Sequence, residues 1–165
     1  KESSAASDVY KRQKQDTLHF IKKAEKDTLA VYKYPEGTLV DLNEADTTEL
    51  KKIPGIGSGI ARMIVAYRKR LGGFYDMAQL KEVNYVDEDM LRWFKLGNAP
   101  IHRINANKAG LDKLRSHPYM NFYQAKVIIE YRRKKGKLKS LSQLSLYEEF
   151  TEKDLERLSH YLAFD

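Results

Sequence analysis

Residues 51–70 read KKIPGIGSGIARMIVAYRKR and include the residues of this chain best suited to bind a charged ligand. Gly55 and Gly57 are separated by one apolar residue, and glycine allows backbone angles that a side chain would block. A sharp turn there can present several N–H groups at the start of the next helix, whose partial positive charge favours phosphate. The predicted phosphate-binding turn comprises Gly55, Ile56, Gly57, Ser58 and Gly59.

Basic side chains surround this turn. Lys51, Lys52 and Arg62 are close enough in sequence to flank a bound phosphate, and no acidic residue occurs in residues 51–70. Because a solvated helix face normally mixes acids with bases, this pattern predicts phosphate contacts. The plainer interpretation is a corner between two helices whose terminal cations only favour the helix dipole. The segment ends with three more basic residues, Arg68, Lys69 and Arg70.

A second basic segment, residues 126–139, reads KVIIEYRRKKGKLK. It carries seven basic residues and one acid, and residues 51–70 carry six basic residues, so each segment holds a charge of +6 in a chain of net charge +7. The basicity is therefore concentrated in two places, which suggests a polyanionic partner. The predicted secondary basic surface is formed by Lys126, Arg132, Arg133, Lys134 and Lys135.

The two basic segments are equivalent parts of an internal repeat. Shifting the chain by 64 residues aligns residues 40–80 with residues 104–144 without a gap, and 11 of the 41 pairs are identical. Chance would give about two or three identities at ordinary residue frequencies. A period of this length predicts two copies of a small domain rather than a solenoid unit.

The signals inside each copy are helical. Asp46 followed by Glu49 is a capping-box pattern that predicts a helix start, and Pro54 predicts its end. An apolar stripe at Ile56, Ile60, Ile64 and Tyr67 then predicts a second helix with one buried face. Glycine at 72 or 73 predicts its C-terminal stop, because glycine takes the left-handed conformation cheaply.

Two more helices are expected in each copy. Asp76 with Gln79, and Ser140 with Gln143 in the second copy, predict a third helix by the same capping box. Asp87 and Thr151 are candidate caps for a fourth. Strand signals are nearly absent except in residues 28–42, an extended lead-in. We therefore predict an all-α fold of two tandem domains, residues 37–98 and 99–165, preceded by an N-terminal arm or exposed helix at residues 1–36.

The stretch around the first turn resembles the helix-hairpin-helix module of the ComEA-type competence DNA-receptor family. The shared pattern is an Asn-x-Ala start, a leucine before the hairpin, Pro-Gly-Ile-Gly, an Ala-x-x-Ile helix ending in Tyr-Arg, and a Gly-x-Phe followed by leucine. Both copies together extend the resemblance over about residues 40–162. The matching residues are Asn43, Ala45, Leu50, Ile53 to Gly57, Ala61, Ile64, Tyr67, Arg68, Gly72 or Gly73, Phe74 and Leu80.

The resemblance implies a compact helical fold and sequence-independent binding of double-stranded DNA, with hairpin amides contacting phosphates across the minor groove. It also implies a role in DNA uptake outside the cytoplasm or at the membrane. No apolar run approaches the roughly 18 residues that span a bilayer, so any anchor would lie outside this chain.

The chain departs from that family in two places. The stretches that match the family's second hairpin, residues 83–91 and 146–155, lack glycine and are rich in acid, which favours a structural role. In the second copy, Tyr119 and Asn121 replace the two glycines of the first hairpin. Because tyrosine restricts the turn, that copy is expected to rely on its basic surface or to bind a protein partner. A scaffold for protein–protein contacts is therefore the alternative function.

Enzymatic function has no support in the sequence. The chain has no cysteine, which excludes disulfides and thiolate metal sites. No convergent acid, base and nucleophile is visible. We expect no catalysis, no cofactor, no metal and no small-molecule substrate. The four histidines, His19, His102, His117 and His160, are too widely spaced to resemble a ligand motif.

Overall fold

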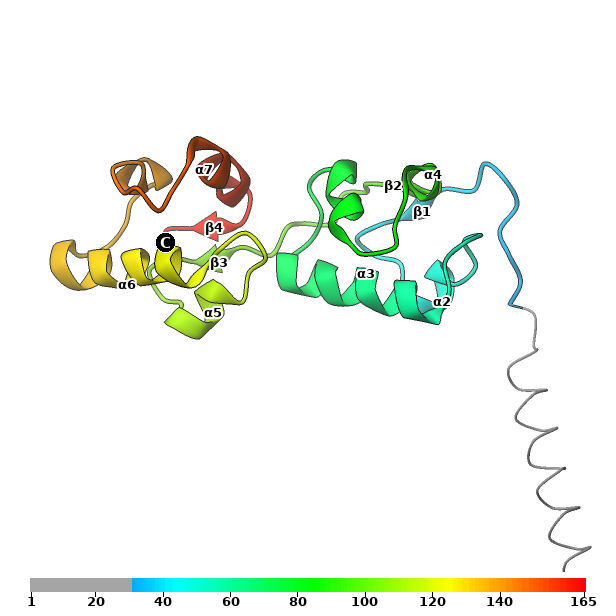
Figure 1. Cartoon of the computed structure of the whole chain (residues 1–165), viewed down its shortest axis with the longest axis horizontal. Helices are drawn as coiled ribbons and strands as arrows, with labels where there is room; N and C mark the ends of the chain where they lie inside the picture. The colour runs from blue at the N-terminus through cyan, green and yellow to red at the C-terminus, as the bar shows by residue number, and fades with distance from the viewer. Residues whose placement is uncertain (1–30) are drawn as a thin grey trace, which may run out of the picture. The chain divides into compact units, whose positions relative to one another are not determined.

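The computed structural model describes residues 31–165, and Lys33–Asp165 form one compact unit (Figure 1). The predicted arm, residues 1–36, lies almost wholly outside the described residues. We call residues 37–98 the first repeat and residues 99–165 the second repeat. No helix within residues 31–165 has the length and apolar character needed to cross a membrane.

The first repeat contains four helical segments between two short strands. The capping box of Asp46 and Glu49 is present at the start of α2, and Asp76 and Gln79 form the predicted box before the next helix, which is a 3₁₀ helix. The elements are β1 (Val40–Asp41), α2 (Thr47–Leu50), α3 (Ser58–Leu71), the 3₁₀ helix η1 (Met77–Glu82), α4 (Glu88–Leu91) and β2 (Phe94–Lys95).

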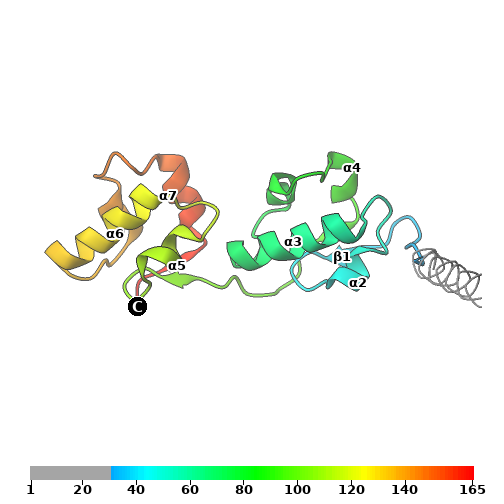
Figure 2. The ribbon, with the colours of Figure 1, turned by 60° about the horizontal axis from the view of Figure 1, so that its bottom comes forward.

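The second repeat has the same element order. Its long helix α6 starts and ends 64 residues after α3, as the aligned sequences require, and both helices have 14 residues. In two views α3 passes beside α2 and α6 passes beside α5 (Figures 1 and 2). The elements are β3 (Ile104–Asn105), α5 (Leu111–Arg115), α6 (Phe122–Lys135), the 3₁₀ helix η2 (Leu141–Leu144), α7 (Glu152–Ser159) and β4 (Leu162–Ala163).

The fold is mostly helical, as predicted, but it also contains four two-residue strands within residues 31–165. β1 pairs in parallel with β2, and β3 pairs in parallel with β4, so each repeat is closed by its own two ends. The Val40 N–H donates to the Trp93 carbonyl at 2.8 Å, and the Ile104 N–H donates to the Tyr161 carbonyl at 2.8 Å. A two-residue strand has too few residues for the alternation that sequence patterns detect. Within residues 31–42, the described part of the predicted lead-in, the strand is confined to Val40–Asp41.

In the first hairpin of each repeat, a tight turn precedes the second helix, which is α3 in the first repeat and α6 in the second. The Ile56 N–H donates to the Ile53 carbonyl, and the Met120 N–H donates to the His117 carbonyl, at 3.1 and 3.0 Å. Ile56 is buried, as its place in the apolar stripe predicts, but it lies in the turn because α3 begins at Ser58. The helix therefore begins two residues after the first residue of the stripe.

Each repeat has its own hydrophobic core, built on the buried stripe of its long helix. Ala61 and Ile64 of α3 and the equivalent Ala125 and Ile128 of α6 are fully buried. Trp93 belongs to the core of the first repeat, as expected. Tyr161 crosses the repeat boundary, because it lies in the second repeat but is buried within the first core.

The Tyr161 hydroxyl is hydrogen-bonded on both sides inside that core. It donates to the Gly73 carbonyl and accepts from the Gln79 Nε2, both at 2.8 Å. Because the side chain is fully buried, water cannot replace either partner. Burial raises the pKa of Tyr161, which keeps the hydroxyl protonated as a donor. Tyr161 therefore joins the two repeats.

Replacing Tyr161 with phenylalanine removes both hydrogen bonds while keeping the ring. The change leaves a buried carbonyl and a buried amide without this partner, so we expect the free energy of unfolding to fall by about 1–3 kcal/mol. Urea unfolding measures the loss. The matched control is Tyr123→Phe, at a side chain that is 68% exposed, which should change stability by less than about 0.5 kcal/mol. Equal effects of the two substitutions would contradict this role of Tyr161.

Candidate nucleic-acid interface

The start of α3 is a helix N-terminus without a side-chain cap. Its N-cap is Gly57, which has no side chain to accept a hydrogen bond from the first turn. The first N–H groups of any helix have no partner inside the helix, and here no acidic residue occupies the first turn. A Cβ atom at Gly57 or Gly59 would meet nothing within 4 Å, so the approach to these N–H groups is open.

The residues of the predicted phosphate-binding turn have different roles. Gly55 has φ +84°, a left-handed angle that favours glycine, whereas Gly57 is extended and any residue could adopt its conformation. The Ile56 N–H is used within the turn. Ser58 and Gly59 are exposed and lie in the first turn of α3. The groups available to an anion are therefore the N–H groups at the start of α3.

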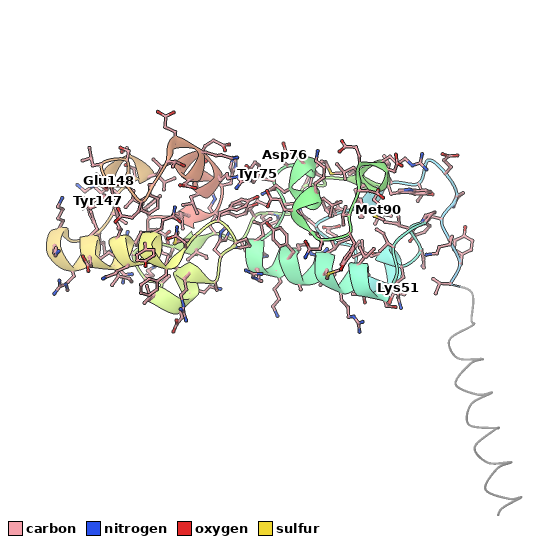
Figure 3. The ribbon with its side chains drawn as sticks, in the orientation of Figure 1. Lys51, Tyr75, Asp76, Met90, Tyr147 and Glu148 are labelled. Atoms are coloured by element: carbon pink, nitrogen blue, oxygen red, sulfur yellow. The ribbon has the colours of Figure 1, made fainter. Side chains whose placement is uncertain are left out.

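The three predicted flanking cations lie in the segments on either side of the hairpin turn. Lys51 and Lys52 follow α2 directly and are half-buried, and Arg62 is exposed one turn into α3. Figure 3 shows Lys51 at the end of the first repeat where α3 begins. Lys52 also lies over the ring of Tyr34, with its Nζ 5.6 Å from the ring centroid. Two of these charges therefore precede the hairpin turn in the chain, and the third follows it on α3.

Lys33 adds a charge that sequence reasoning missed. Its Nζ donates to three backbone carbonyls of the hairpin, those of Lys51, Ile53 and Ile56, at 2.6, 3.2 and 3.3 Å. The ammonium group therefore ties the carbonyls of the turn together and places a positive charge beneath it. Lys33 precedes the repeat and has no equivalent motif in the second copy, so no pattern in the sequence pointed to it.

Arg68 and Arg132 point into the fold. The Arg68 Nη1 donates to the carbonyls of Leu42 and Ala45 at 2.9 and 2.8 Å, and the Arg132 Nη1 donates to the Ala109 carbonyl at 2.6 Å. Burial lowers the pKa of Arg68, an effect that Asp41 partly offsets. These contacts hold the start of each repeat against its long helix, so we leave both arginines out of the DNA surface proposed below.

The other predicted basic residues are solvent-exposed along the two long helices. Lys69 and Arg70 lie on the exposed part of α3, together with Arg62. The equivalent residues of α6 are exposed as well. They are Lys126, Arg133 and Lys134, and Lys135 follows them at the end of the helix.

The first hairpin of the second repeat is closed to phosphate. Asn121 is the N-cap of α6, and its side-chain oxygen accepts from the Gln124 N–H at 2.9 Å, while the Gln124 side chain accepts from the Asn121 N–H. Tyr119 does not take a left-handed φ; among the described residues Tyr85 is the one non-glycine that does. The Tyr119 side chain turns toward the first repeat instead.

Tyr119 enters a polar cluster around Glu82 of the first repeat. Its hydroxyl donates to the Glu82 carboxylate at 2.8 Å and accepts from the Gln79 Nε2 at 2.8 Å. The Arg157 Nη2 lies 2.9 Å from the same carboxylate, and its guanidinium lies over the Tyr119 ring. Tyr67 also donates to Glu82. Burial and Glu82 raise the pKa of Tyr119 to about 12.

His117 completes the contact between the repeats. Its Nε2 lies 2.9 Å from the Leu71 carbonyl, and its Nδ1 lies 3.1 Å from the Tyr119 N–H. A neutral imidazole protonated on Nε2 satisfies both contacts, because Nδ1 must accept. Burial lowers the pKa of His117 to about 4 from its ordinary value of 6.5, and Arg70 and Lys113 act in the same direction. Tyr75, which Figure 3 labels, stacks on His160 of the second repeat with the ring centroids 3.7 Å apart.

In the acidic hairpins, residues 83–91 and 146–155, side chains also cap the helix N-termini. Asp87 caps α4 by accepting from the Met90 N–H, and Thr151 caps α7 with a capping box, so both predicted caps are confirmed. Both helices carry acidic residues in the first turn. These two helix starts therefore repel phosphate, in agreement with the interpretation of residues 83–91 and 146–155 as structural hairpins.

Within residues 31–165 no group of three or more His, Asp or Glu side chains is placed to hold a metal ion. Among the α-helices within residues 31–165, α3 is the one that starts with neither a side-chain cap nor an acidic residue in its first turn, since α5 also lacks a cap but carries Asp112 there. The start of α3 belongs to a hairpin between two helices, and the same hairpin geometry occurs in the second repeat with different residues.

Family comparison agrees with this architecture. The family model of the helix-hairpin-helix motif matches residues 36–93 and 100–163, which are most of the chain. The chain therefore belongs to the helix-hairpin-helix family. The narrower resemblance to ComEA-type competence receptors is not confirmed by this match.

The chain is also similar to vertebrate proteins named endonuclease/exonuclease/phosphatase family domain-containing protein 1. It is 27% identical to the protein from Mus musculus over 154 residues, covering 73% of this chain and 27% of the relative. The protein from Danio rerio is 28% identical over 127 residues, covering 64% of this chain and 23% of the relative. The chain thus spans about a quarter of the length of these relatives. No solved structure matches it.

The depressed pKa of His117 predicts an acid-sensitive fold. Because the folded pKa is about 4 and the unfolded pKa about 6.5, the unfolded chain binds more protons between these values. The stability that His117 contributes is complete above about pH 6.5 and falls, by at most about 3 kcal/mol, as the pH drops to about 4. Urea unfolding of wild type and His117→Gln across this range measures the effect. A variant with the same pH dependence as wild type would exclude His117 as the cause.

Proposed function

We propose that this chain binds double-stranded DNA without regard to sequence, through the open N-terminus of α3. The observation that carries the proposal is the missing side-chain cap at Gly57, which has open space around it, with Lys51, Lys52 and Arg62 in the segments on either side of the turn. A helix start of this kind offers backbone N–H donors and a favourable dipole to a phosphate. Membership of the helix-hairpin-helix family supports a nucleic-acid partner.

Sequence independence follows from the groups that would make contact. Backbone N–H groups and cationic side chains bind phosphates, which are the same at every base pair. The exposed Lys69 and Arg70 extend the positive charge along α3, so a duplex on this face would meet cations over the length of the helix. We propose binding to the duplex backbone, with no base-specific readout.

We propose a binding role rather than a catalytic one. The relatives' name refers to an endonuclease/exonuclease/phosphatase family domain, and the chain spans about a quarter of their length. The groups that we assign to DNA contact are backbone N–H groups and cationic side chains. They position a phosphate, but they do not activate a water molecule to hydrolyse it. In a longer protein of this kind, these residues would hold DNA for another part to act on.

A protein partner is the second candidate, and Tyr85 favours it. This residue is 79% exposed and holds a φ of 67°, an angle that costs a non-glycine residue about 1–2 kcal/mol. It lies at the tip of the acidic hairpin formed by residues 83–91. A partner contact through this hairpin would not depend on Gly57, so the substitutions below separate the two functions.

Substituting Gly57 with aspartate should stabilise the fold and weaken DNA binding. Aspartate at an N-cap accepts from the first helical N–H groups, which raises stability by roughly 0.3–1 kcal/mol. The same carboxylate occupies the N–H groups that we assign to phosphate and repels the phosphate. We expect affinity for a duplex of mixed sequence to fall by at least about tenfold at low salt. Fluorescence anisotropy titration measures the affinity, and urea unfolding measures the stability.

The chain provides a matched control in Gly110. This glycine is the N-cap of α5, has no side-chain cap and has open space around it. Gly110→Asp therefore adds the same charge and the same cap at a helix start in the second repeat, and should leave duplex affinity unchanged. The proposal fails if the Gly57 and Gly110 substitutions have equal effects on binding, or if the Gly57 substitution has none.

Salt dependence tests the cations separately. We expect log affinity to fall with log salt concentration with a slope of about 2–5, since each phosphate contact contributes about 0.9. Combined alanine substitution of Lys51, Lys52 and Arg62 should lower the slope by about 2–3. The control is alanine substitution of Lys95, Lys113 and Lys153, which are exposed outside the two basic segments and should leave the slope unchanged. A wild-type affinity that does not vary with salt would contradict the proposal.

A further inference from the structure

The second repeat exposes two aromatic rings where the first repeat has small residues. Phe122 and Tyr123 of α6 are equivalent to Ser58 and Gly59 of α3. Phe122 is 44% exposed and Tyr123 is 68% exposed, and their rings meet edge to face with centroids 5.6 Å apart. Two adjacent exposed rings form a contiguous apolar patch, and contiguous apolar patches are a feature of interaction sites.

Basic side chains follow the rings along the same helix. Lys126 lies three residues after Tyr123, and Arg133 lies seven residues further, spacings that place all three on one face of α6. Lys126 and Arg133 are both exposed. The one acid of the helix, Glu130, lies 3.5 Å from Lys134 and is neutralised by it. The exposed face of α6 thus begins with two rings and continues with unopposed positive charge.

This face cannot repeat the phosphate binding that we propose for α3. Asn121 and Gln124 fill the helix start with their capping box, and Tyr119 is held in the contact with the first repeat. The second repeat therefore retains the cations of the first repeat but offers rings in place of open backbone N–H groups.

We propose that the exposed face of α6 binds single-stranded DNA, with unpaired bases stacked on Phe122 and Tyr123 and the backbone following Lys126 and Arg133. Bases of every kind have an apolar π face that stacks on an aromatic ring, and a basic track beside such rings follows the phosphates. The positive charge of the face favours this polyanion over an apolar or basic protein surface. The proposal goes beyond duplex binding and uses a different helix.

The test compares two single strands of about 12 nucleotides, oligothymidine and an abasic strand of the same length and charge. Both offer the same phosphates, but only oligothymidine offers bases. Wild type should bind oligothymidine about tenfold more tightly than the abasic strand in fluorescence anisotropy titrations. In the double variant Phe122→Ser with Tyr123→Gly, which introduces the residues of the first repeat, this preference should disappear while the abasic strand binds as it does to wild type.

Leu146→Ala is the matched control, because this apolar side chain of the second repeat is 86% exposed and lies outside α6. It should retain the preference for bases. Urea unfolding checks that each variant is folded. A wild type without preference for bases overturns the proposal, and so does a preference that survives in the double variant, which would leave the two rings to a protein partner.

Blunt duplex binding distinguishes this proposal from the proposed function. Gly57→Asp should weaken binding to the blunt duplex but retain the preference for oligothymidine over the abasic strand. If wild type fails to bind the duplex yet prefers oligothymidine, the duplex function fails and the single-strand proposal stands. If wild type binds the duplex but shows no preference for oligothymidine over the abasic strand, the single-strand proposal fails and the duplex function stands.

Discussion

The backbone N–H groups at the start of a helix must find acceptors outside the helix, and the helices of this molecule meet that requirement in different ways. In α6 the side chains of Asn121 and Gln124 meet it, and in α4 and α7 the caps Asp87 and Thr151 meet it. The N-caps of α3 and α5 are Gly57 and Gly110, which have no side chain to accept these bonds, but α5 carries Asp112 in its first turn and α3 carries no acid there. An acceptor from outside the protein can take that place, and phosphate has the charge that the helix dipole and the nearby lysines favour.

The two repeats share one architecture but use their first hairpins differently. In the first repeat the hairpin turn faces solvent above the Lys33 ammonium. In the second repeat the equivalent turn supplies His117 and Tyr119 to a contact with Leu71, Gln79 and Glu82. The duplicated hairpin has thus become a joint between repeats, and Tyr161, buried in the core of the first repeat, reinforces it. A joint with internal hydrogen bonds fixes α3 and α6, the two helices to which we assign binding in our proposals, relative to each other.

Much of this fold could be predicted from local sequence. The capping boxes and the glycine at the end of α3 depend on residues a few positions apart, and the structure contains them. The third helices are 3₁₀ helices, which the same capping pattern cannot distinguish from α-helices. The parallel strand pairs were missed because their partners are more than 50 residues apart and each strand has only two residues.

The sequence by itself determined which residues are duplicated, where the positive charge is concentrated and which hairpin retains glycine. Only the tertiary structure decided which cations face solvent. Arg68 and Arg132 look equivalent to their basic neighbours in the sequence, yet both point inward because carbonyls 23 residues away need donors. Likewise, Lys33 and Tyr161 act on groups 18 and 88 residues away. Such contacts depend on how the chain packs against itself, and no local pattern of residue types encodes them.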